Sequence, residues 1–571
     1  MGGKAVDTVN EPNVRLIPPP FQPPSPAACE NVAPQPGSSA GAETCNTVNF
    51  ETWALAVEWE AADSGLDYWF PMILPNPDGG SDVATSDMGV GLSLRSGDDG
   101  SQRGWFPTSG HADASPVSFA RSGAGTAIAT WLEPPESGVQ ILRTWAESGN
   151  LTVDSERMDD LGGIARWLDV DADGVPEVVG HNLSMRQNGA TLSHIRGHIS
   201  FNTASSANGD FDGDGRTEIA STQGIWDPLT GELTPWAGLS EYTFHGAPVL
   251  LDGQIALMGT DGSGAFRATP TGEVLWRLPL RRNDEDQIAI GDVDGDGVPE
   301  MAVYTYDAIF VVDKNGVILW TVGAQASGVG SLVMADLDAD ARQEIIAFGP
   351  SGIQILQGAT GVILGEDTGL YNTSAYASPA IADVDQDGSA EIVVVGQIRD
   401  TETYALRVYG PSRGSWARTR PVWNELDYDV TTIQDDGRLA VWPIPSWESY
   451  NSFRAQPAHD GVHPDLTVTA TDLCCDADTV QLAVQPSNLG SVDALAGAMV
   501  TLSTNDGGGW RAVATRVLDE GIDAHVAASG FVFEVPRADW GSLQVVQITG
   551  TDGDECDFVN DRVQIELTCA D

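Results

Sequence analysis

The chain has few basic residues and no long apolar run. Its 571 residues include 28 lysines and arginines against 82 aspartates and glutamates, so the formal net charge is −54. A field of this sign repels polyanions, which argues against nucleic acid and anionic membrane surfaces as partners. No apolar run reaches the roughly 18 residues of a membrane span, so we expect no transmembrane segment. Cations and basic partners remain open, and solubility in a salty medium is the alternative reason for the charge.

Cysteine is absent from the long middle of the chain. The six cysteines lie at positions 29, 45, 474, 475, 556 and 569. This even, clustered use favours disulfides over free thiols, most simply Cys29 with Cys45 and a second set among the last four, whose pairing stays open. Disulfides are typical of an oxidising compartment, so we expect an extracellular or cell-surface protein. The N-terminus has no apolar signal region, and we expect any export signal to be removed or to lie outside this sequence.

Catalytic motifs are also scarce. The G-x-S-x-G match at Gly37 lies in a proline-rich stretch and lacks the strand-to-helix turn of a nucleophile elbow. His194 and His198 have the spacing of a zinc pair, but Gly197 and the strand context break the helix that such a pair needs. We therefore expect that the protein is not an enzyme.

Composition divides the chain into four segments and predicts an all-β protein. Residues 1–45 are rich in proline, which predicts an extended linker or tether. Residues 46–456 consist of short apolar runs separated by Gly, Asp and Asn turns, the pattern of strands. After a linker at 457–463, residues 464–571 alternate polar and apolar side chains, which predicts an immunoglobulin-like β-sandwich.

An acidic nine-residue stretch recurs in the second segment. It reads DVDADGVPE at Asp169, DFDGDGRTE at Asp210, DVDGDGVPE at Asp292, DLDADARQE at Asp336 and DVDQDGSAE at Asp383. The offsets between successive stretches are 41, 82, 44 and 47 residues. Since 82 is twice 41, a repeat that has lost its acidic loop lies between Asp210 and Asp292. That unit is GAPVLLDGQIALMGTDG, a second shortened one is SPVSFARSGAGTAIATWL, and a weaker one begins near WFPMILPNPDGG.

Each unit predicts four strands. An apolar run enters the acidic loop, two more follow, and a glycine turn such as Asn315-Gly316 leads into a fourth strand. Four strands per repeat of this length are typical of propeller blades, which bury both faces by stacking around an axis. We therefore predict a β-propeller of eight blades, or seven if the first unit is only a lead-in. Tryptophans at strand ends, such as Trp276 and Trp320, favour packing between blades over sugar stacking.

The acidic loops have the chemistry of calcium sites. Ca²⁺ takes about six to eight oxygen ligands, and side chains at positions 1, 3 and 5 of a tight turn converge, joined by a carbonyl at 7 and a carboxylate at 9. Position 12 after Asp292 is Val303, which excludes an EF-hand. The predicted ligands are Asp169, Asp171, Asp173, Val175, Glu177, Asp210, Asp212, Asp214, Arg216, Glu218, Asp292, Asp294, Asp296, Val298, Glu300, Asp336, Asp338, Asp340, Arg342, Glu344, Asp383, Asp385, Asp387, Ser389 and Glu391.

The number of ions expected is four to five. Glycine at position 6 permits the sharp bend in four loops, whereas the loop at Asp336 has Ala341 there, which strains the bend. An acidic turn without metal is the alternative for each loop, and Mg²⁺ suits the ligand sets less well because its octahedron is rigid.

The repeats resemble the FG-GAP and VCBS repeats of the integrin alpha-subunit propeller and of secreted bacterial proteins. The resemblance covers roughly residues 60–456 and rests on the five acidic loops. RPVWNELDYDVTTIQDDG and NSFRAQ resemble the closing segment of bacterial members, and DGDECDFVNDRV is similar to the end of CARDB-type adhesion sandwiches. The resemblance implies that each loop joins the first two strands of a blade and binds calcium on one rim, with partners on the opposite rim.

These observations predict a calcium-binding adhesion module for a protein or glycan ligand. A structural subunit of an extracellular assembly, built from copies of itself, is one alternative. A propeller enzyme acting on polysaccharide, with acid and base residues at the axial funnel, is another, since propellers carry both functions.

Overall fold

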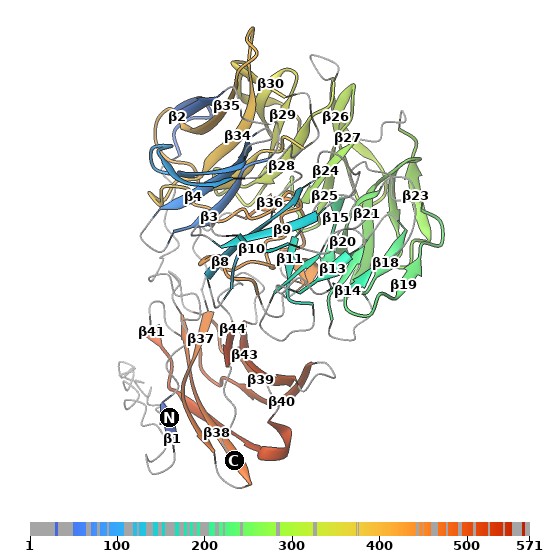
Figure 1. Cartoon of the computed structure of the whole chain (residues 1–571). Helices are drawn as coiled ribbons and strands as arrows, with labels where there is room; N and C mark the ends of the chain where they lie inside the picture. The colour runs from blue at the N-terminus through green and yellow to red at the C-terminus, as the bar shows by residue number, and fades with distance from the viewer. Residues whose placement is uncertain are drawn as a thin grey trace, which may run out of the picture.

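The computed structural model is an all-β fold (Figure 1). Among the described residues the only helical elements are two short 3₁₀ turns, η1 (Ser446–Glu448) and η2 (Arg537–Asp539). No helix in that part of the chain has the length and apolar character needed to cross a membrane. The structure describes residues 29–31, 50–550 and 562–565 except for gaps at 64–69, 77–79, 88–90, 108–117, 123–124, 133–140, 147–150, 155–165, 171–175, 180–182, 187–190, 195–204, 210, 212–215, 221–222, 240–243, 281–285, 324–327, 373, 375, 441–444, 449, 458–465, 476–477, 489–493, 506–509, 523–525 and 541–542.

In the described part of residues 55–411, eight sheets form whose four main strands pair antiparallel, and we number them in chain order. Sheets 1 to 4 are β3 (Met72–Pro75), β4 (Ser81–Asp87), β5 (Gly91–Ser96) and β6 (Gln102–Pro107); β7 (Ser118–Ser122), β8 (Gly125–Leu132), β9 (Ile141–Ala146) and β10 (Leu151–Asp154); β11 (Arg166–Leu168), β12 (Glu177–Val179), β13 (Leu183–Met185) and β14 (Thr191–His194); and β16 (Asn208–Gly209), β17 (Glu218–Ala220), β18 (Gly224–Trp226) and β19 (Leu233–Pro235).

Sheets 5 to 8 complete the series. They are β20 (Phe244–Leu251), β21 (Gln254–Asp261), β22 (Gly264–Ala268) and β23 (Val274–Leu278); β24 (Gln287–Gly291), β25 (Glu300–Tyr304), β26 (Ala308–Val312) and β27 (Ile318–Gly323); β28 (Ser331–Ala335), β29 (Glu344–Gly349), β30 (Gly352–Leu356) and β31 (Ile363–Asp367); and β33 (Ala380–Ala382), β34 (Glu391–Ile398), β35 (Tyr404–Pro411) and β2 (Leu55–Asp63). Three short strands add to their edges, namely β15 (Ser205–Ser206), β32 (Leu370–Tyr371) and β36 (Ala455–Gln456).

The shortened repeats predicted from sequence form sheets of the same kind. The weak first unit becomes sheet 1, the second becomes sheet 2, and the unit around Asp252 becomes sheet 5. In sheet 5 the residues Asp252 and Gly253 form the turn, with φ of 55° and 74°, in place of an acidic loop. Two residues at positive φ match the twist of a tight hairpin, so the loop can be lost without changing the strand pairing.

Sheet 8 is made from both ends of the repeat region. Its fourth strand is β2, which pairs antiparallel with β35 from Leu55 opposite Pro411 to Asp63 opposite Tyr404. The sequence analysis did not foresee this closure, because an isolated strand before the first repeat carries no repeat signal. The pairing joins chain segments about 350 residues apart, and it leaves sheets 1 and 8 as neighbours: the N–H of Ser81 donates to the Val384 carbonyl at 2.7 Å.

Residues 412–456, which we call the central segment, run through the middle of the eight sheets (Figure 1). Most of its described residues are buried, including Trp416, Trp423 and Tyr428. The segment contacts the first strand of every sheet, in the order of the sheets. The contacts are Ile73 with Trp423, Ser118 with Glu425, Arg166 with Asp427, Gly209 with Trp447, Leu250 with Asn451, Ile290 with Phe453, Met334 with Arg454, and Ile381 with Gln456.

Tryptophans of the fourth strands pack on the hairpin glycines of the next sheet, as the sequence predicted. Trp276 donates from Nε1 to the Lys314 carbonyl at 2.8 Å, and its ring covers Gly316, where φ is 81°. Trp320 repeats this arrangement on the next sheet, donating to the Gly358 carbonyl at 2.7 Å and covering Gly361. A glycine is needed at both turns because φ is positive and the ring leaves no room for a Cβ.

The C-terminal part has two further sheets. One contains β37 (Leu466–Cys475), β38 (Thr479–Asn488), β41 (Val526–Ala527) and β42 (Phe531–Pro536), and the other β39 (Met499–Asn505), β40 (Trp510–Val517), β43 (Leu543–Thr549) and β44 (Arg562–Ile565). Residues of both sheets, such as Leu482, Phe533 and Val546, share one core. The predicted linker at 457–463 lies almost entirely outside the described residues.

The proline-rich segment contributes one strand to the first of these sheets. β1 (Cys29–Asn31) pairs antiparallel with β37, with Cys29 opposite Cys474. The predicted Cys29–Cys45 pair involves Cys45, which lies outside the described residues, as do Cys556 and Cys569. No cysteine among the described residues is free.

Candidate metal centres

Three of the five acidic loops are fully described, and each gathers carboxylates. They join β24 to β25, β28 to β29, and β33 to β34, which are the first and second strands of sheets 6, 7 and 8. Three carboxylate groups in each loop have oxygens within 4.8 Å of one another. The three groups are Asp292 with Asp294 and Glu300, Asp336 with Asp338 and Asp340, and Asp383 with Asp385 and Glu391.

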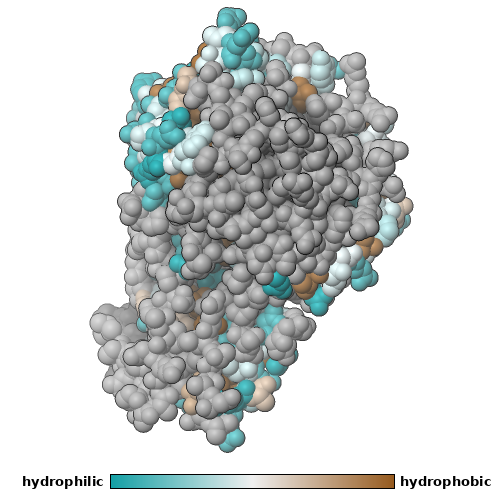
Figure 2. Space-filling model, viewed as in Figure 1, coloured by the Kyte–Doolittle hydropathy of each residue, from teal (hydrophilic) through white to brown (hydrophobic). Residues whose placement is uncertain are grey.

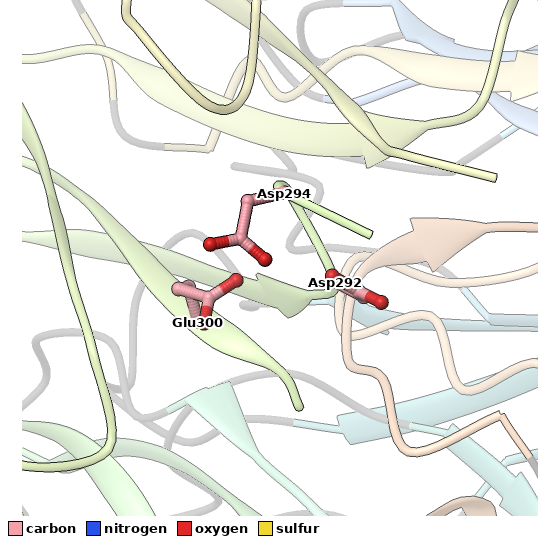
Figure 3. Close-up of side chains that lie close together, drawn as sticks. All are labelled: Asp292, Asp294 and Glu300. Carbon is pink, nitrogen blue, oxygen red and sulfur yellow. The ribbon is translucent and has the colours of Figure 1, made fainter. Parts of the chain in front are cut away.

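The close-up of the sheet 6 loop shows how the side chains converge (Figure 3). The carboxylates of Asp294 and Glu300 face each other, with Asp292 beside them at the end of its strand. Asp292 also holds the turn together, because its carboxylate accepts hydrogen bonds from the N–H groups of Gly295 and Gly297, both at 2.7 Å. The loop is thus shaped by the side chain at its first position.

The three loops share one backbone conformation at positions 4 and 6. The φ values there are 79° and 79° at Gly295 and Gly297, 57° and 64° at Ala339 and Ala341, and 59° and 89° at Gln386 and Gly388. Positive φ favours glycine, so the prediction that Ala341 strains its loop agrees with the observed conformation. The loop nevertheless keeps its shape, because Asp336 accepts the N–H of Ala341 at 2.9 Å, as Asp383 accepts that of Gly388 at 3.1 Å.

The glutamate at position 9 has a structural role that the sequence analysis missed. In all five loops its Oε2 accepts the N–H of position 2, which ties the start of the second strand to the loop. The pairs are Val170 with Glu177 at 3.2 Å, Phe211 with Glu218 at 2.8 Å, Val293 with Glu300 at 3.2 Å, Leu337 with Glu344 at 3.0 Å and Val384 with Glu391 at 2.8 Å. All five glutamates are buried, so one carboxylate oxygen of each is held by the backbone.

The electrostatics of the loops favour a cation. Burial, together with the charges of the neighbouring aspartates, raises the pKa of Glu300 to about 8 and that of Glu344 to about 9. Burial also raises the pKa of Asp336 to about 7 and that of Asp383 to about 7. A bound cation removes this cost, because an opposite charge favours the ionised carboxylates.

A buried orphan oxygen supports the fit of a metal. Asp383 is 1% exposed, and its Oδ1 has no hydrogen-bond partner, while its Oδ2 lies 3.4 Å from Nε of Arg418. Asp338 Oδ1 in the preceding loop is likewise buried without a hydrogen-bond partner. Buried polar atoms are nearly always satisfied, so these oxygens fit ligands of a hard cation such as Ca²⁺.

The remaining predicted ligands are only partly placed. In the first two loops, Asp169 and Glu177 are buried, as is Glu218, and Arg216 is described at the end of its loop. The other members of those loops lie outside the described residues, namely Asp171, Asp173, Val175, Asp210, Asp212 and Asp214. The clusters do not include the position-5 residues Asp296 and Asp387, nor Glu344 at position 9 of the loop at Asp336. The carbonyls of Val298, Arg342 and Ser389 remain predicted ligands.

Three acidic residues of the central segment form a different kind of cluster. Glu425, Asp427 and Asp429 alternate along the chain and are all buried. Arg166 pairs with Asp427, with Nη2 2.9 Å from Oδ2. Burial, opposed by the charge of Arg166 and reinforced by Asp427, raises the pKa of Glu425 to about 7. All three acids are buried within the described part of the protein.

Comparison with known proteins identifies a fold. No protein-family model and no curated protein matches the chain. The chain is similar to the solved structure of the V. cholerae biofilm matrix protein Bap1, with a TM-score of 0.56 and 13% identity over 72% of this chain and 99% of that one. It is also similar to the rhamnogalacturonan lyase YesW, with a TM-score of 0.45 and 15% identity over 65% of this chain and 77% of that one. A third likeness is to BamB from Moraxella catarrhalis, with a TM-score of 0.38 and 13% identity over 62% of this chain and 97% of that one. The likeness to Bap1 and the series of four-stranded sheets together show that the fold of this chain is all-β and propeller-like.

Proposed function

We propose that the chain is an extracellular calcium-binding adhesion or matrix protein. In this proposal, sheets 1 to 8 are the blades of an eight-bladed propeller of the FG-GAP/VCBS type. The two C-terminal sheets are an immunoglobulin-like, CARDB-like sandwich, and the cysteines form disulfides. The five acidic loops hold four to five calcium ions as structural ligands, and the ligand of the protein is a protein or a glycan.

The observation that carries the metal part is the repeated cluster of carboxylates with a buried orphan oxygen at Asp383. The same loop recurs at the same place in successive sheets, between first and second strands, so the clusters belong to the repeat and not to one blade. Ca²⁺ accepts such flexible oxygen sets better than Mg²⁺ does. A metal bound only by the folded state stabilises it in proportion to its affinity.

One comparison supports a binding role. The similar structure of Bap1 is that of a biofilm matrix protein. On the face shown in Figure 2, the described surface is mainly hydrophilic with scattered hydrophobic residues, as expected of a protein exposed to water. A structural subunit that assembles from copies of itself is the alternative that the same likeness favours.

The enzyme alternative is less well supported. Polysaccharide cleavage needs an acid and a base that reach the substrate. In the central segment Glu425, Asp427, Asp429 and Asp435 are buried, and Asp436 is partly exposed. We therefore propose that the protein is not an enzyme.

Metal removal tests the calcium proposal. Thermal unfolding of the calcium-loaded chain with and without EDTA is expected to differ by many degrees, with calcium found in the purified protein. A variant with Asp292→Asn, Asp336→Asn and Asp383→Asn should lose most of that difference. The control variant Glu51→Gln, Glu232→Gln, Glu273→Gln removes the same number of charges at exposed positions and should keep it. An unchanged midpoint in EDTA, with no calcium in the protein, contradicts the proposal.

Binding arrays test the function. Glycan and protein arrays probed with and without calcium should show calcium-dependent binding for an adhesin. Concentration-dependent self-association with no array signal would favour the structural-subunit alternative. Release of oligosaccharides from polysaccharides would favour the enzyme.

A further inference from the structure

The closing strand β2 carries a glutamate where the fourth strands of sheets 5 to 7 carry leucine. In sheets 5 to 8 the fourth strand has a bulge at the same position of its pairing with the third strand. The bulged residues are Leu275, Leu319, Leu364 and, in β2, Glu58. Bulges re-aim a side chain and are often found near functional sites.

The carboxylate of Glu58 lies beside the acidic loop of its own sheet. It occupies the space over Gly410, since a Cβ at Gly410 would lie 2.1 Å from Glu58 Oε1. Strand β35 pairs with β34 through Ile392 opposite Tyr409, so one step further along the same register Gly410 lies opposite Glu391. Residues directly opposite in an antiparallel pair project from the same face of the sheet, with Cβ atoms about 5 Å apart. The Glu58 carboxylate therefore takes the place of a side chain next to Glu391.

The carboxylates of Glu58 and of the loop at 383–391 influence one another electrostatically. Partial burial and the charges of Asp385 and Asp387 raise the pKa of Glu58 to about 7. Burial raises the pKa of Glu391 well above its usual value, and the charges of Asp383 and Glu58 add to this shift. Asp98 of the neighbouring sheet 1 also acts on Asp385, while Arg418 lies 3.4 Å from Asp383. Five carboxylates, those of Glu58 and the four acids of the loop, thus influence one another, and Arg418 lies against Asp383. Asp383 Oδ1 among them is buried without a hydrogen-bond partner.

We propose that Glu58 is a further ligand of the cation bound by the loop at 383–391, so that one ion links the closing strand β2 to the loop of sheet 8. This inference rests on the proposed calcium sites and adds a ligand from outside the repeat. Gly410 is the residue that makes room for it. Since β2 is the only strand of sheet 8 supplied by the N-terminal side of the repeat region, the ion at this loop stabilises the closure of the ring of sheets.

Hydrogen exchange of the full chain during a calcium titration tests the proposal. Peptides covering 383–391 give the calcium midpoint of this site, and peptides covering 55–63 report the pairing of β2. We expect Glu58→Gln to weaken the calcium midpoint at 383–391 on the order of 10-fold, as the loss of one supporting group typically does. It should also reduce the protection that calcium gives to 55–63. The loop at 292–300 serves as internal control, because Leu319 takes the place of Glu58 there, and its midpoint should not change.

A second variant keeps every carboxylate. Gly410→Ala displaces the Glu58 carboxylate, so it should weaken the midpoint at 383–391 in the same direction, while Glu232→Gln at an exposed turn should leave it unchanged. If calcium protects 383–391 from exchange with the same midpoint in the wild type, Glu58→Gln and Gly410→Ala, Glu58 is not a ligand. The proposed calcium site in the loop would then still stand. If calcium protects none of the acidic loops in the wild type, the proposed calcium sites themselves are wrong.

Discussion

Arg166 and Asp427 form a buried ion pair although 261 residues separate them in the sequence. The guanidinium Nη2 lies 2.9 Å from the carboxylate Oδ2, and both side chains are almost fully inaccessible to water. Arg166 also donates to Asn208 of sheet 4 at 3.1 Å. One arginine on the first strand of sheet 3 thus connects the central segment to the next sheet.

Removing one partner of this pair should destabilise the protein strongly. Asp427→Asn removes the charge that pairs directly with a buried guanidinium, and breaking a buried pair in this way typically costs about 3 to 5 kcal/mol. Chemical denaturation measures the free energy of unfolding. The matched control is Asp539→Asn, which breaks the exposed pair with Arg511 at 3.2 Å and should cost less than about 1 kcal/mol. Equal effects of the two variants would contradict a role of the central segment in holding the sheets.

The contact of Trp320 with Gly361 should be sensitive to one methyl group. A Cβ at Gly361, where φ is 71°, would lie 2.5 Å from the tryptophan ring. Gly361→Ala therefore combines an unfavourable φ with overpacking, and we expect a loss of about 3 kcal/mol in the free energy of unfolding. Gly253→Ala is the control, because φ there is 74° but no atom lies within 4 Å of the added Cβ. It should cost only about 1 kcal/mol; a loss as large as that of Gly361→Ala would rule out the packing explanation.

Replacing Ala341 in the loop at 336–344 with glycine should stabilise the folded protein. Ala341 has a φ of 64°, which a residue with a Cβ adopts at a cost of about 1 to 2 kcal/mol. Ala341→Gly should therefore raise the unfolding free energy by about 1 kcal/mol, measured by denaturation in EDTA. Ala390→Gly in the loop at 383–391 is the control, since Ala390 is not among the residues with positive φ, and it should be destabilising. A destabilising effect at both positions would mean that Ala341 is not strained.

Glu425 should make stability depend on pH. Burial raises the pKa of this carboxyl from 4.5 to about 7, so the folded state binds its proton more tightly than the unfolded state does. Its contribution to stability is fully present below about pH 4.5 and is lost as the pH rises through about 7, a change on the order of 3 kcal/mol. Denaturation curves between pH 5 and 8 in saturating calcium should show this loss in the wild type, and Glu425→Gln should reduce it.

The control for this pH series is Glu232→Gln, which changes an exposed carboxyl and should follow the wild type. Saturating calcium keeps the loop carboxylates ionised and so removes their contribution to the pH dependence. Parallel curves for the wild type and Glu425→Gln would show that Glu425 does not titrate in this range.

The sequence by itself determined the repeat, the strand pattern and the place of the acidic loops. This is possible because each repeat is a local unit: DVDGDGVPE, its flanking apolar runs and the turn at Asn315-Gly316 all lie within one repeat. The shortened unit at Asp252 could be found by its spacing for the same reason. The packing of Trp276 and Trp320 between sheets could be predicted because it too recurs with the repeat.

Only the tertiary structure decided which contacts join different repeats. The pairing of β2 with β35, the course of residues 412–456 past every first strand, and the place of Glu58 over Gly410 all join residues far apart in the sequence. No local periodicity encodes such contacts, since each depends on which surfaces the closed arrangement of sheets brings together. The loops at Asp292, Asp336 and Asp383 follow from sequence, whereas the further carboxylate beside the last of them follows from the closure of the ring.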